Sequence, residues 1–313
     1  MAATVLTYVE PGVIERKGVG ANLLDREFDM LLNRRNAVPL EGAGLFQVVR
    51  AAKDVFKAGT VGNELELPRE NEDTDALPYV TPPPGFTKTI NVVNYRSAIA
   101  VTRTMVEDDQ HGKVKGLMSG LIDSARYHME YGFADMFNNG FATYEWADGM
   151  YLFDTVHPNE ARETGTWDNT TTAAALTHSA YSSARTRLRK RTNARGYYSG
   201  MKPMELITVP DKEEAAKIIM ASEKVSGNAL NDKNVFQGDA TVKIWGYLTS
   251  TTAWFIAAKV EPEQRGLLYV QRVAPNVAPV KTVDPDILFD QRLRMRYAIG
   301  ATSCRELDGN SGA

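Results

Sequence analysis

Cysteine, histidine and long apolar runs are scarce in this sequence of 313 residues. The one cysteine, Cys304, cannot form a disulfide within the chain or build a cysteine-rich zinc site. No run of about 18 apolar residues is present, so no membrane-spanning helix is expected. The first residues lack the basic start and long apolar stretch of a signal peptide. Together these absences predict a soluble protein made in a reducing compartment.

A strong excess of charge is missing as well. The sequence holds 36 Lys and Arg against 39 Asp and Glu, which gives a formal net charge of −3. A chain so close to neutrality is not suited to compacting nucleic acid by charge alone. Hydrophobic residues make up 43% of the sequence, which is enough to form a core and predicts a folded protein.

Catalytic motifs are few. The four histidines form no His-Glu-x-x-His motif, and neither a Walker loop nor a dinucleotide fingerprint is present. His157 is either a base oriented by Asp154 or, as the following proline favours, a turn residue. The carboxylates at 107–109 either bind Mg²⁺ or Ca²⁺ or, more simply, interact with the dipole of the helix that they precede. His128 is interpreted as a half-buried helix residue with satisfied ring nitrogens. We therefore expect no catalytic residue, no metal site and no cofactor.

An acidic, proline-rich stretch between residues 58 and 87 separates two strand-like stretches, 48–56 and 89–105. Six acids gather near its centre, namely Glu64, Glu66, Glu70, Glu72, Asp73 and Asp75. A loop longer than about 12–15 residues without a core of its own is usually functional or disordered. The acidic segment is therefore either a contact region or simply a solvated loop.

The rest of the chain shows clear helix and strand patterns. An apolar stripe at three- and four-residue steps predicts a helix from about residue 113 to 138, with a left-handed exit at Gly140. A second helix, capped by Thr177 or Ser179, is predicted to run towards residue 192. A third is predicted at 211–222, with a capping-box start. Strands are predicted at 206–210, 240–248, 253–258, 267–273 and 287–299. Because helices and strands are segregated rather than strictly alternating, the predicted fold class is α+β.

The second helix is unusually basic. Five cations occupy the seven positions from 185 to 191, namely Arg185, Arg187, Arg189, Lys190 and Arg191. They surround the helix, so they indicate either an anion site for nucleic acid or another chain, or a solvated face whose cations favour the helix C-terminus.

The order of these elements resembles that of the major capsid proteins of tailed phages, which share the Hong Kong 97 capsid fold. Several short stretches are similar to the head-subunit proteins of Mu-like phages. They are Phe-Asp-Thr-Val-His-Pro at 153–158, Leu-Ile-Thr-Val-Pro at 206–210, Asn-Asp-Lys-Asn-Val-Phe at 231–236, Trp-Phe-Ile at 254–256 and Tyr-Ala-Ile-Gly at 297–300. The resemblance covers roughly residues 45–305, and the shared order carries it more than any single motif.

The resemblance implies five segments. They are an N-terminal arm at 1–45, an extended loop with flanking strands at 46–105, a spine helix and peripheral domain at 106–202, an axial domain at 203–282, and a returning strand with a C-terminal tail at 283–313. It also implies a major capsid protein that self-assembles into the icosahedral head shell enclosing the phage genome. Such a protein is not an enzyme.

The expected partners follow from that role. They are identical subunits in hexamers and pentamers, portal, scaffolding and possible decoration proteins, and packaged double-stranded DNA in nonspecific contact, with no membrane. The protein would be found in the virion after assembly in the host cytoplasm. We hypothesise that the acidic segment meets Arg187 and Arg191 of an adjacent subunit. Alternatives are an encapsulin-type nanocompartment shell, a hydrolase using His157 and Asp154, and a DNA-binding module built on residues 185–195.

Overall fold

The computed structural model describes eight stretches of the chain and four further residues. The stretches are 38–59, 85–102, 111–159, 165–171, 173–193, 196–225, 232–279 and 287–312, and the single residues are Met30, Arg34, Tyr79 and Thr104. The acidic segment at 64–75 and the carboxylates at 107–109 lie outside the described residues. No helix in the described part is long and apolar enough to cross a membrane.

Contacts divide the chain into two compact units, neither of which is continuous in sequence. One combines residues 1–39, 96–125 and 275–294, and the other combines 40–95, 126–274 and 295–313. The larger unit contains most of the described contacts. The stretches 93–102, 111–138, 267–279 and 287–301, which form elements described below, contribute residues to both units.

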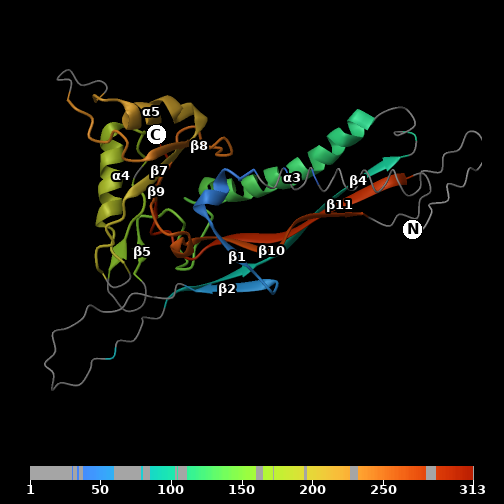
Figure 1. Ribbon diagram of the computed structural model, residues 1–313. Coiled ribbons are helices and arrows are strands. Elements are labelled where there is room, and N and C mark those ends of the chain that lie inside the picture. Colours follow the sequence, from blue (N-terminus) through green and yellow to red (C-terminus); the bar gives the residue numbers. More distant parts are fainter. Residues whose placement is uncertain are drawn as a thin grey trace, which may run out of the picture. The chain divides into compact units, whose positions relative to one another are not determined.

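In the described part of the chain, ten strands form two four-stranded sheets and a hairpin, and two short strands form a further pair (Figure 1). One sheet has the order β1-β10-β11-β4, with bounds Gln47–Arg50, Leu267–Pro279, Ile287–Ala301 and Val93–Thr102. The other has the order β12-β9-β7-β8, with bounds Leu307–Asn310, Trp254–Ala258, Pro203–Thr208 and Thr241–Ile244. The hairpin pairs β2, Val55–Gly59, with β3, Thr87–Asn91. The short pair is β5, His157–Pro158, with β6, Thr166–Trp167. Strands and helices are thus mixed as α+β.

Helix α3, His111–Asn138, confirms the long helix predicted at 113–138. The predicted stripe is buried from Leu121 to Phe137, because residues at three- and four-residue steps share one face of a helix. The left-handed exit is wrong, since Gly140 does not adopt a positive φ. A Cβ there would lie 2.8 Å from the Met136 carbonyl oxygen and 2.9 Å from the Phe153 ring, so close packing explains this glycine.

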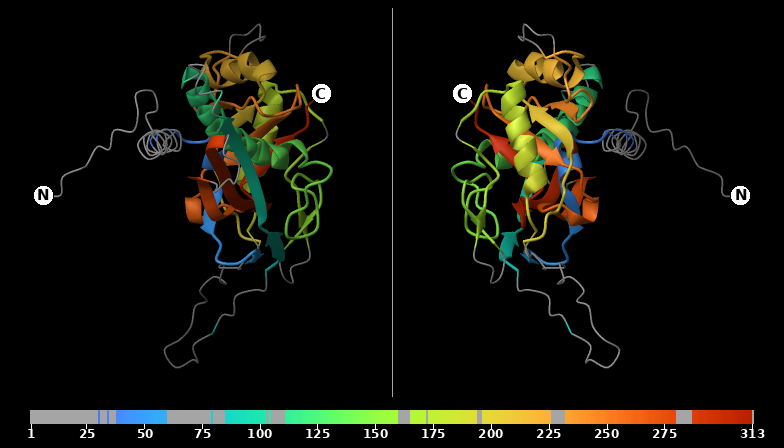
Figure 2. Two further views of the ribbon diagram at one scale, coloured as in Figure 1. Left: turned by 90° about the vertical axis from the view of Figure 1, so that its right-hand side faces the viewer. Right: turned by 90° about the vertical axis from the view of Figure 1, so that its left-hand side faces the viewer.

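The sheet β12-β9-β7-β8 is covered by helices α4, His178–Lys190, and α5, Glu213–Ala221 (Figures 1 and 2). The buried residues of their common core come from the stretch between Leu176 and Ala258 in the sequence. Helix α4 therefore shares a core with strands from the predicted axial segment. The Thr177 cap is confirmed, because its Oγ1 accepts the Ala180 N–H at 3.2 Å.

The capping box at Asp211 is wrong. Pro210 opens a short 3₁₀ turn, Pro210–Lys212, and α5 then begins at Glu213 without a side-chain cap. The proline occupies the first helical position, where its fixed φ favours a helical turn before the longer helix starts.

The hairpin β2–β3 packs on one face of the sheet β1-β10-β11-β4. Ala58 and Ile90 contact Leu268, Val270 and Ala298 in a small apolar cluster. The hairpin register pairs Val55 with Asn91 at one end and Gly59 with Thr87 at the other. The loop that contains the acidic segment therefore joins the hairpin at the Gly59 end.

Strand β11 confirms the strand predicted at 287–299. Leu293, Met295 and Tyr297 are buried, whereas Arg292 and Arg294 are exposed and Arg296 is half-buried. This alternation follows from the two-residue period of a strand. Two short turns complete the described elements, η1 at Gly42–Leu45 and η3 at Pro262–Gln264.

Candidate functional site

His157 is fully buried rather than placed at a surface cleft. Its ring stacks on Trp167, with the centroids 4.3 Å apart. Its Nε2 lies 3.1 Å from Asn169 Oδ1, and its Nδ1 lies 2.9 Å from Asp148 Oδ2. Trp146 Nε1 approaches the same Nδ1 at 3.0 Å. Both ring nitrogens are therefore engaged inside the protein.

The orienting carboxylate is Asp148, so the prediction of an Asp154–His157 pair is wrong. Asp154 Oδ1 instead accepts the Val156 N–H at 3.2 Å, which closes a local turn. His157 lies at the start of β5, and its partner strand brings Trp167 against it. A base must reach the proton that it removes, and this imidazole is covered on all sides. The cluster holds together the segment that follows α3.

Arg187 of the basic helix α4 and Arg191, the C-cap residue that follows the helix, both bind one buried carboxylate, Asp308. Arg187 donates through Nε at 2.7 Å and Nη2 at 2.5 Å, and Arg191 donates through Nη2 at 3.0 Å. Burial alone would lower the pKa of Arg187, but the hydrogen bonds and charge of Asp308 outweigh it and raise that pKa. The pair therefore fastens strand β12 to α4.

Arg191 also donates hydrogen bonds to backbone carbonyl groups nearby. Its Nη1 donates to the carbonyls of Arg305 and Leu307, each at 2.7 Å, and its Nη2 donates to the Asp168 carbonyl at 3.0 Å. Its guanidinium lies 5.3 Å from the Trp167 ring centroid. Arg187 and Arg191 are thus brought together, but their partners lie in their own chain.

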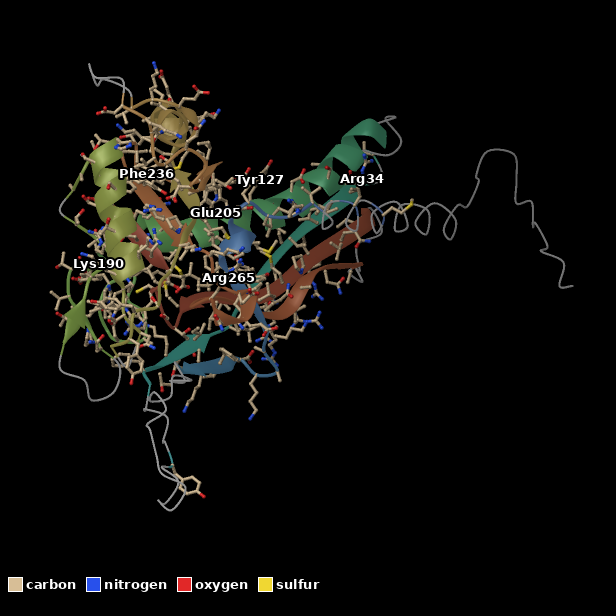
Figure 3. All side chains as sticks on the ribbon, turned by 60° about the vertical axis from the view of Figure 1, so that its left-hand side comes forward. Arg34, Tyr127, Lys190, Glu205, Phe236 and Arg265 are labelled. Carbon is tan, nitrogen blue, oxygen red and sulfur yellow. The ribbon has the colours of Figure 1, made fainter. Side chains whose placement is uncertain are left out.

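A third arginine of α4 is paired on the other side of the helix. Arg185 donates to Asp239 through Nε at 2.7 Å and Nη2 at 2.9 Å, and the Tyr181 hydroxyl donates to the same carboxylate at 2.8 Å. Burial alone would raise the pKa of Asp239, but these hydrogen bonds outweigh it and hold the pKa below its usual value. Only Arg189 and Lys190 of the five cations are exposed, and Lys190 lies at the end of α4 (Figure 3).

The sequence pattern did not identify the anions of these networks. Asp308 is 121 positions from Arg187, and Asp239 is 54 positions from Arg185. Neither acid belongs to an acidic run, so no local signal indicated them. The interpretation of α4 as a wholly solvated face is therefore wrong for three of its five cations.

His128 is more exposed than expected. Its Nδ1 lies 2.6 Å from the Tyr297 hydroxyl, and its ring centroid lies 4.3 Å from that of Tyr95. Burial lowers the pKa of His128 and raises that of Tyr297.

The described residues contain no group of three or more His, Cys, Asp or Glu side chains that could hold a metal ion. Cys304 is a buried free thiol, and burial raises its pKa, which makes it a poor nucleophile.

A shallow depression of about 330 Å³ lies between β3, the turn after α3 and β11. Lys88 Nζ donates to the Glu145 carbonyl at 3.1 Å on its wall, and the Tyr144 hydroxyl donates to the Ile299 carbonyl at 2.7 Å. Burial raises the pKa of Tyr144 to about 12. This lining has no nucleophile beside a base, so it does not form a catalytic arrangement.

Two surface features remain without a role inside the described chain. Tyr127, labelled in Figure 3, is 55% exposed on α3. Tyr131 is 62% exposed, and its ring meets Tyr247 edge to face at 5.1 Å. In the sheet β1-β10-β11-β4, Arg272 of β10 and Arg296 of β11 both donate to the carboxylate of Asp54, which precedes the hairpin strand β2. The geometry thus offers surfaces for contact, whereas the buried charges hold the fold together.

Comparison with known proteins identifies the kind of protein to which this arrangement belongs. The family model described as phage capsid protein matches residues 86–307, which is well over half of the sequence. No curated protein matches the sequence.

Solved structures share the fold at low sequence identity. The capsid of bacteriophage JBD30 is 14% identical, with a TM-score of 0.56 over 68% of this chain and 92% of the other. The capsid of a native GTA particle is 10% identical, with a TM-score of 0.54 over 100% of this chain and 95% of the other. A virus-like particle from Pyrococcus furiosus is 9% identical, with a TM-score of 0.50 over 91% and 98%. These likenesses concern the mixed α+β fold of capsid structures.

Proposed function

We propose that this protein, which belongs to the phage capsid protein family, is the major capsid protein that self-assembles into an icosahedral head shell around the phage genome. The family match over residues 86–307 is the observation that carries this proposal. The similarity to capsids of JBD30 and of the GTA particle supports it, because in both cases copies of a similarly folded chain form a closed particle.

The finer architecture is part of the same proposal. The protein would adopt the Hong Kong 97 capsid fold with the five segments at 1–45, 46–105, 106–202, 203–282 and 283–313, and it would be closest to the Mu-like head subunits. The long helix α3 in the third segment and the strands β7, β8 and β9 with α5 in the fourth support this division. The sheet of these strands also takes β12 from the fifth segment, and β10 of the fourth segment pairs in the other sheet. The shared core of α4 with that sheet suggests moving α4 to the axial segment.

The partners are proposed on the same basis. Identical subunits would form hexamers and pentamers through heterologous contacts, which close only when the rotation between neighbours permits it. Portal, scaffolding and decoration proteins would join the shell, which would assemble in the host cytoplasm and become part of the virion. Packaged double-stranded DNA would be contacted without sequence reading, because contacts with phosphates carry no base information.

Two alternatives make different predictions. An encapsulin-type nanocompartment has some support from the fold similarity to the virus-like particle of Pyrococcus furiosus, but the phage capsid family match favours a phage head. A hydrolase built on His157 has no support from the geometry, because that ring is fully buried and both its nitrogens are engaged.

Sizing and electron microscopy of the purified full-length protein test the proposal directly. A shell protein yields closed particles of megadalton mass, whereas a monomer or dimer at every concentration would contradict the proposal. Particles from a phage lysate separate the two shell functions. Nuclease-protected double-stranded DNA inside them supports a phage head, and a protein cargo in its place supports a nanocompartment.

A further inference from the structure

Asp54 is contacted by two arginines and can neutralise only one of them. Arg272 Nη1 and Arg296 Nη2 both donate to Asp54 Oδ1. The Asp54 side chain is 57% exposed, whereas those of Arg272 and Arg296 are 27% and 17% exposed. The Arg296 Nε is buried and has no hydrogen-bond partner among the described residues. The cluster is therefore a partly desolvated cationic site with a net charge of +1.

The surrounding strands increase this imbalance. The cluster belongs to the sheet β1-β10-β11-β4 and to the hairpin β2–β3. The residues of these strands that lie in the larger unit, together with the turn before β2, are 47–59, 87–95, 267–274 and 295–301. Asp54 is the one acid in these stretches. The six cations are Arg50, Lys53, Lys57, Lys88, Arg272 and Arg296. Arg50, Lys53 and Lys57 are exposed. These stretches together thus carry a net charge of +5, which favours an acidic partner.

The same sequence contains a matching acidic segment. Residues 64–75 hold six carboxylates and one cation, Arg69, so their net charge is −5. The segment is the densest run of acids in the sequence, and it is joined to the hairpin that carries Asp54 at its other end.

We propose that Arg272 and Arg296 form a docking site for the acidic segment, residues 64–75, of a second copy of this protein. This inference rests on the proposed self-assembly. It also revises the hypothesis that Arg187 and Arg191 bind that segment, because both are engaged by Asp308 within their own chain. Arg272 and Arg296, by contrast, share one exposed carboxylate that an incoming acid can supplement.

The hairpin geometry limits how the first acids of the subunit's own segment can reach the Asp54 cluster. Asp54 precedes β2, whereas the loop leaves β2 at Gly59, which pairs with Thr87 at the opposite end. The five residues from Gly59 to Glu64 span at most about 17 Å, so the first acid would reach Asp54 of its own subunit only with a fully stretched connection running back along β2. The acids at 70–75 follow Gly59 by eleven residues or more, so only the mixing experiment below separates the two sources for them. A segment that arrives from a neighbour meets no such constraint.

Charge contacts of this exposure are weak one by one and depend on salt. They set the register and the rate of encounter more than the affinity of one pair. In a shell the contact is repeated in every subunit, so a small loss per contact changes the concentration at which particles form.

The test uses the full-length protein and measures the concentration at which half of it assembles, by light scattering and electron microscopy. In the variant R272Q/R296Q we expect that concentration to rise about tenfold or more at low salt. The conservative variant R272K/R296K keeps both charges and should assemble nearly as well as the wild type. Circular dichroism and melting of the unassembled subunits show whether each variant folds.

Asp54 supplies the matched control. D54N removes the carboxylate within the subunit and leaves both arginines free for a neighbour. If the arginines bind the acidic segment, D54N assembles as well as the wild type or better. If they only hold the hairpin to the sheet, D54N loses assembly as R272Q/R296Q does, and the proposal is overturned.

A mixing experiment separates contact between copies from contact within one copy. One variant carries R272E/R296E, and a second variant carries E70K/E72K/D73K. Each variant alone should assemble poorly, and an equal mixture should assemble better. The acidic segment of the first variant then meets the cationic site of the second, and the lysine-bearing segment of the second meets the acidic site of the first. A mixture that assembles no better than either variant alone would place the contact inside the subunit and overturn the proposal.

Two further outcomes also overturn it. If R272Q/R296Q assembles as the wild type does, the docking site is refuted while the proposed capsid function stands. If its shells form normally but retain less DNA, the arginines serve nucleic acid instead. Failure of the wild-type protein itself to form particles would refute the proposed function. That result is distinct from a failure of the docking site, in which the wild type assembles and the variants behave as it does.

Discussion

Replacing Asp308 with asparagine removes the one carboxylate that neutralises both Arg187 and Arg191. The Asp308 side chain is 0% exposed, and it accepts three hydrogen bonds of 2.5–3.0 Å from the two guanidinium groups. Removing one partner of a buried ion pair costs about 3–5 kcal/mol, because the remaining charge stays buried without compensation. At about 2 °C per kcal/mol for a protein of this size, we expect the melting temperature to fall by roughly 6–10 °C.

The measurement must use the unassembled subunit, because assembly would add stability through linkage. Urea unfolding followed by tryptophan fluorescence is suitable, since Trp167 lies next to the Arg191 guanidinium. Asp168 provides the control. Its carboxylate is 49% exposed and 3.8 Å from Arg187, so Asp168→Asn should cost at most about 1 kcal/mol. A cost below about 1 kcal/mol for Asp308→Asn, or equal costs for both variants, would refute the reasoning.

Two further predictions concern single side chains of the same unit. Because hydrogen bonds from Arg185 and a tyrosine hydroxyl hold the pKa of Asp239 below its usual 3.8, its contribution to stability is complete above that pH and disappears as the pH falls through the lowered value. The difference in unfolding free energy between the wild type and Asp239→Asn should therefore shrink between about pH 5 and pH 2, and a constant difference would contradict this. Gly309→Ala should cost about 1–3 kcal/mol, because the new Cβ would lie 2.5 Å from the Phe153 ring. Gly44→Ala, which meets no atom within 4 Å, should change the melting temperature little, and equal effects would show that packing is not the cause.

Elements with a strong local period could be predicted from the sequence. Helix α3 and strand β11 carry apolar side chains at every third or fourth and every second position, and both lie close to their predicted bounds. The Thr177 cap has an equally local cause, the unsatisfied N–H groups at the start of α4.

Strand β12 could not be predicted, because Leu-Asp-Gly-Asn has little intrinsic preference for a strand. Its conformation comes from pairing with β9, where Asp308 lies opposite Ile256, and from the arginines of α4. The ion pairs of α4 could not be predicted for the same reason. The cations are visible in the sequence, but their partners are 54 and 121 positions away, and only folding brings them together.

The position of β12 beside β9 means that this sheet can be completed only late in protein synthesis. Strand β9 is made about fifty residues before its outer neighbour, so the sheet stays open until residue 310 has left the ribosome. A polypeptide released before residue 307 would present the bare edge of β9, with its backbone groups unpaired, to other nascent polypeptides. Loss of these four residues is therefore expected to expose the edge of β9 to pairing with other polypeptides.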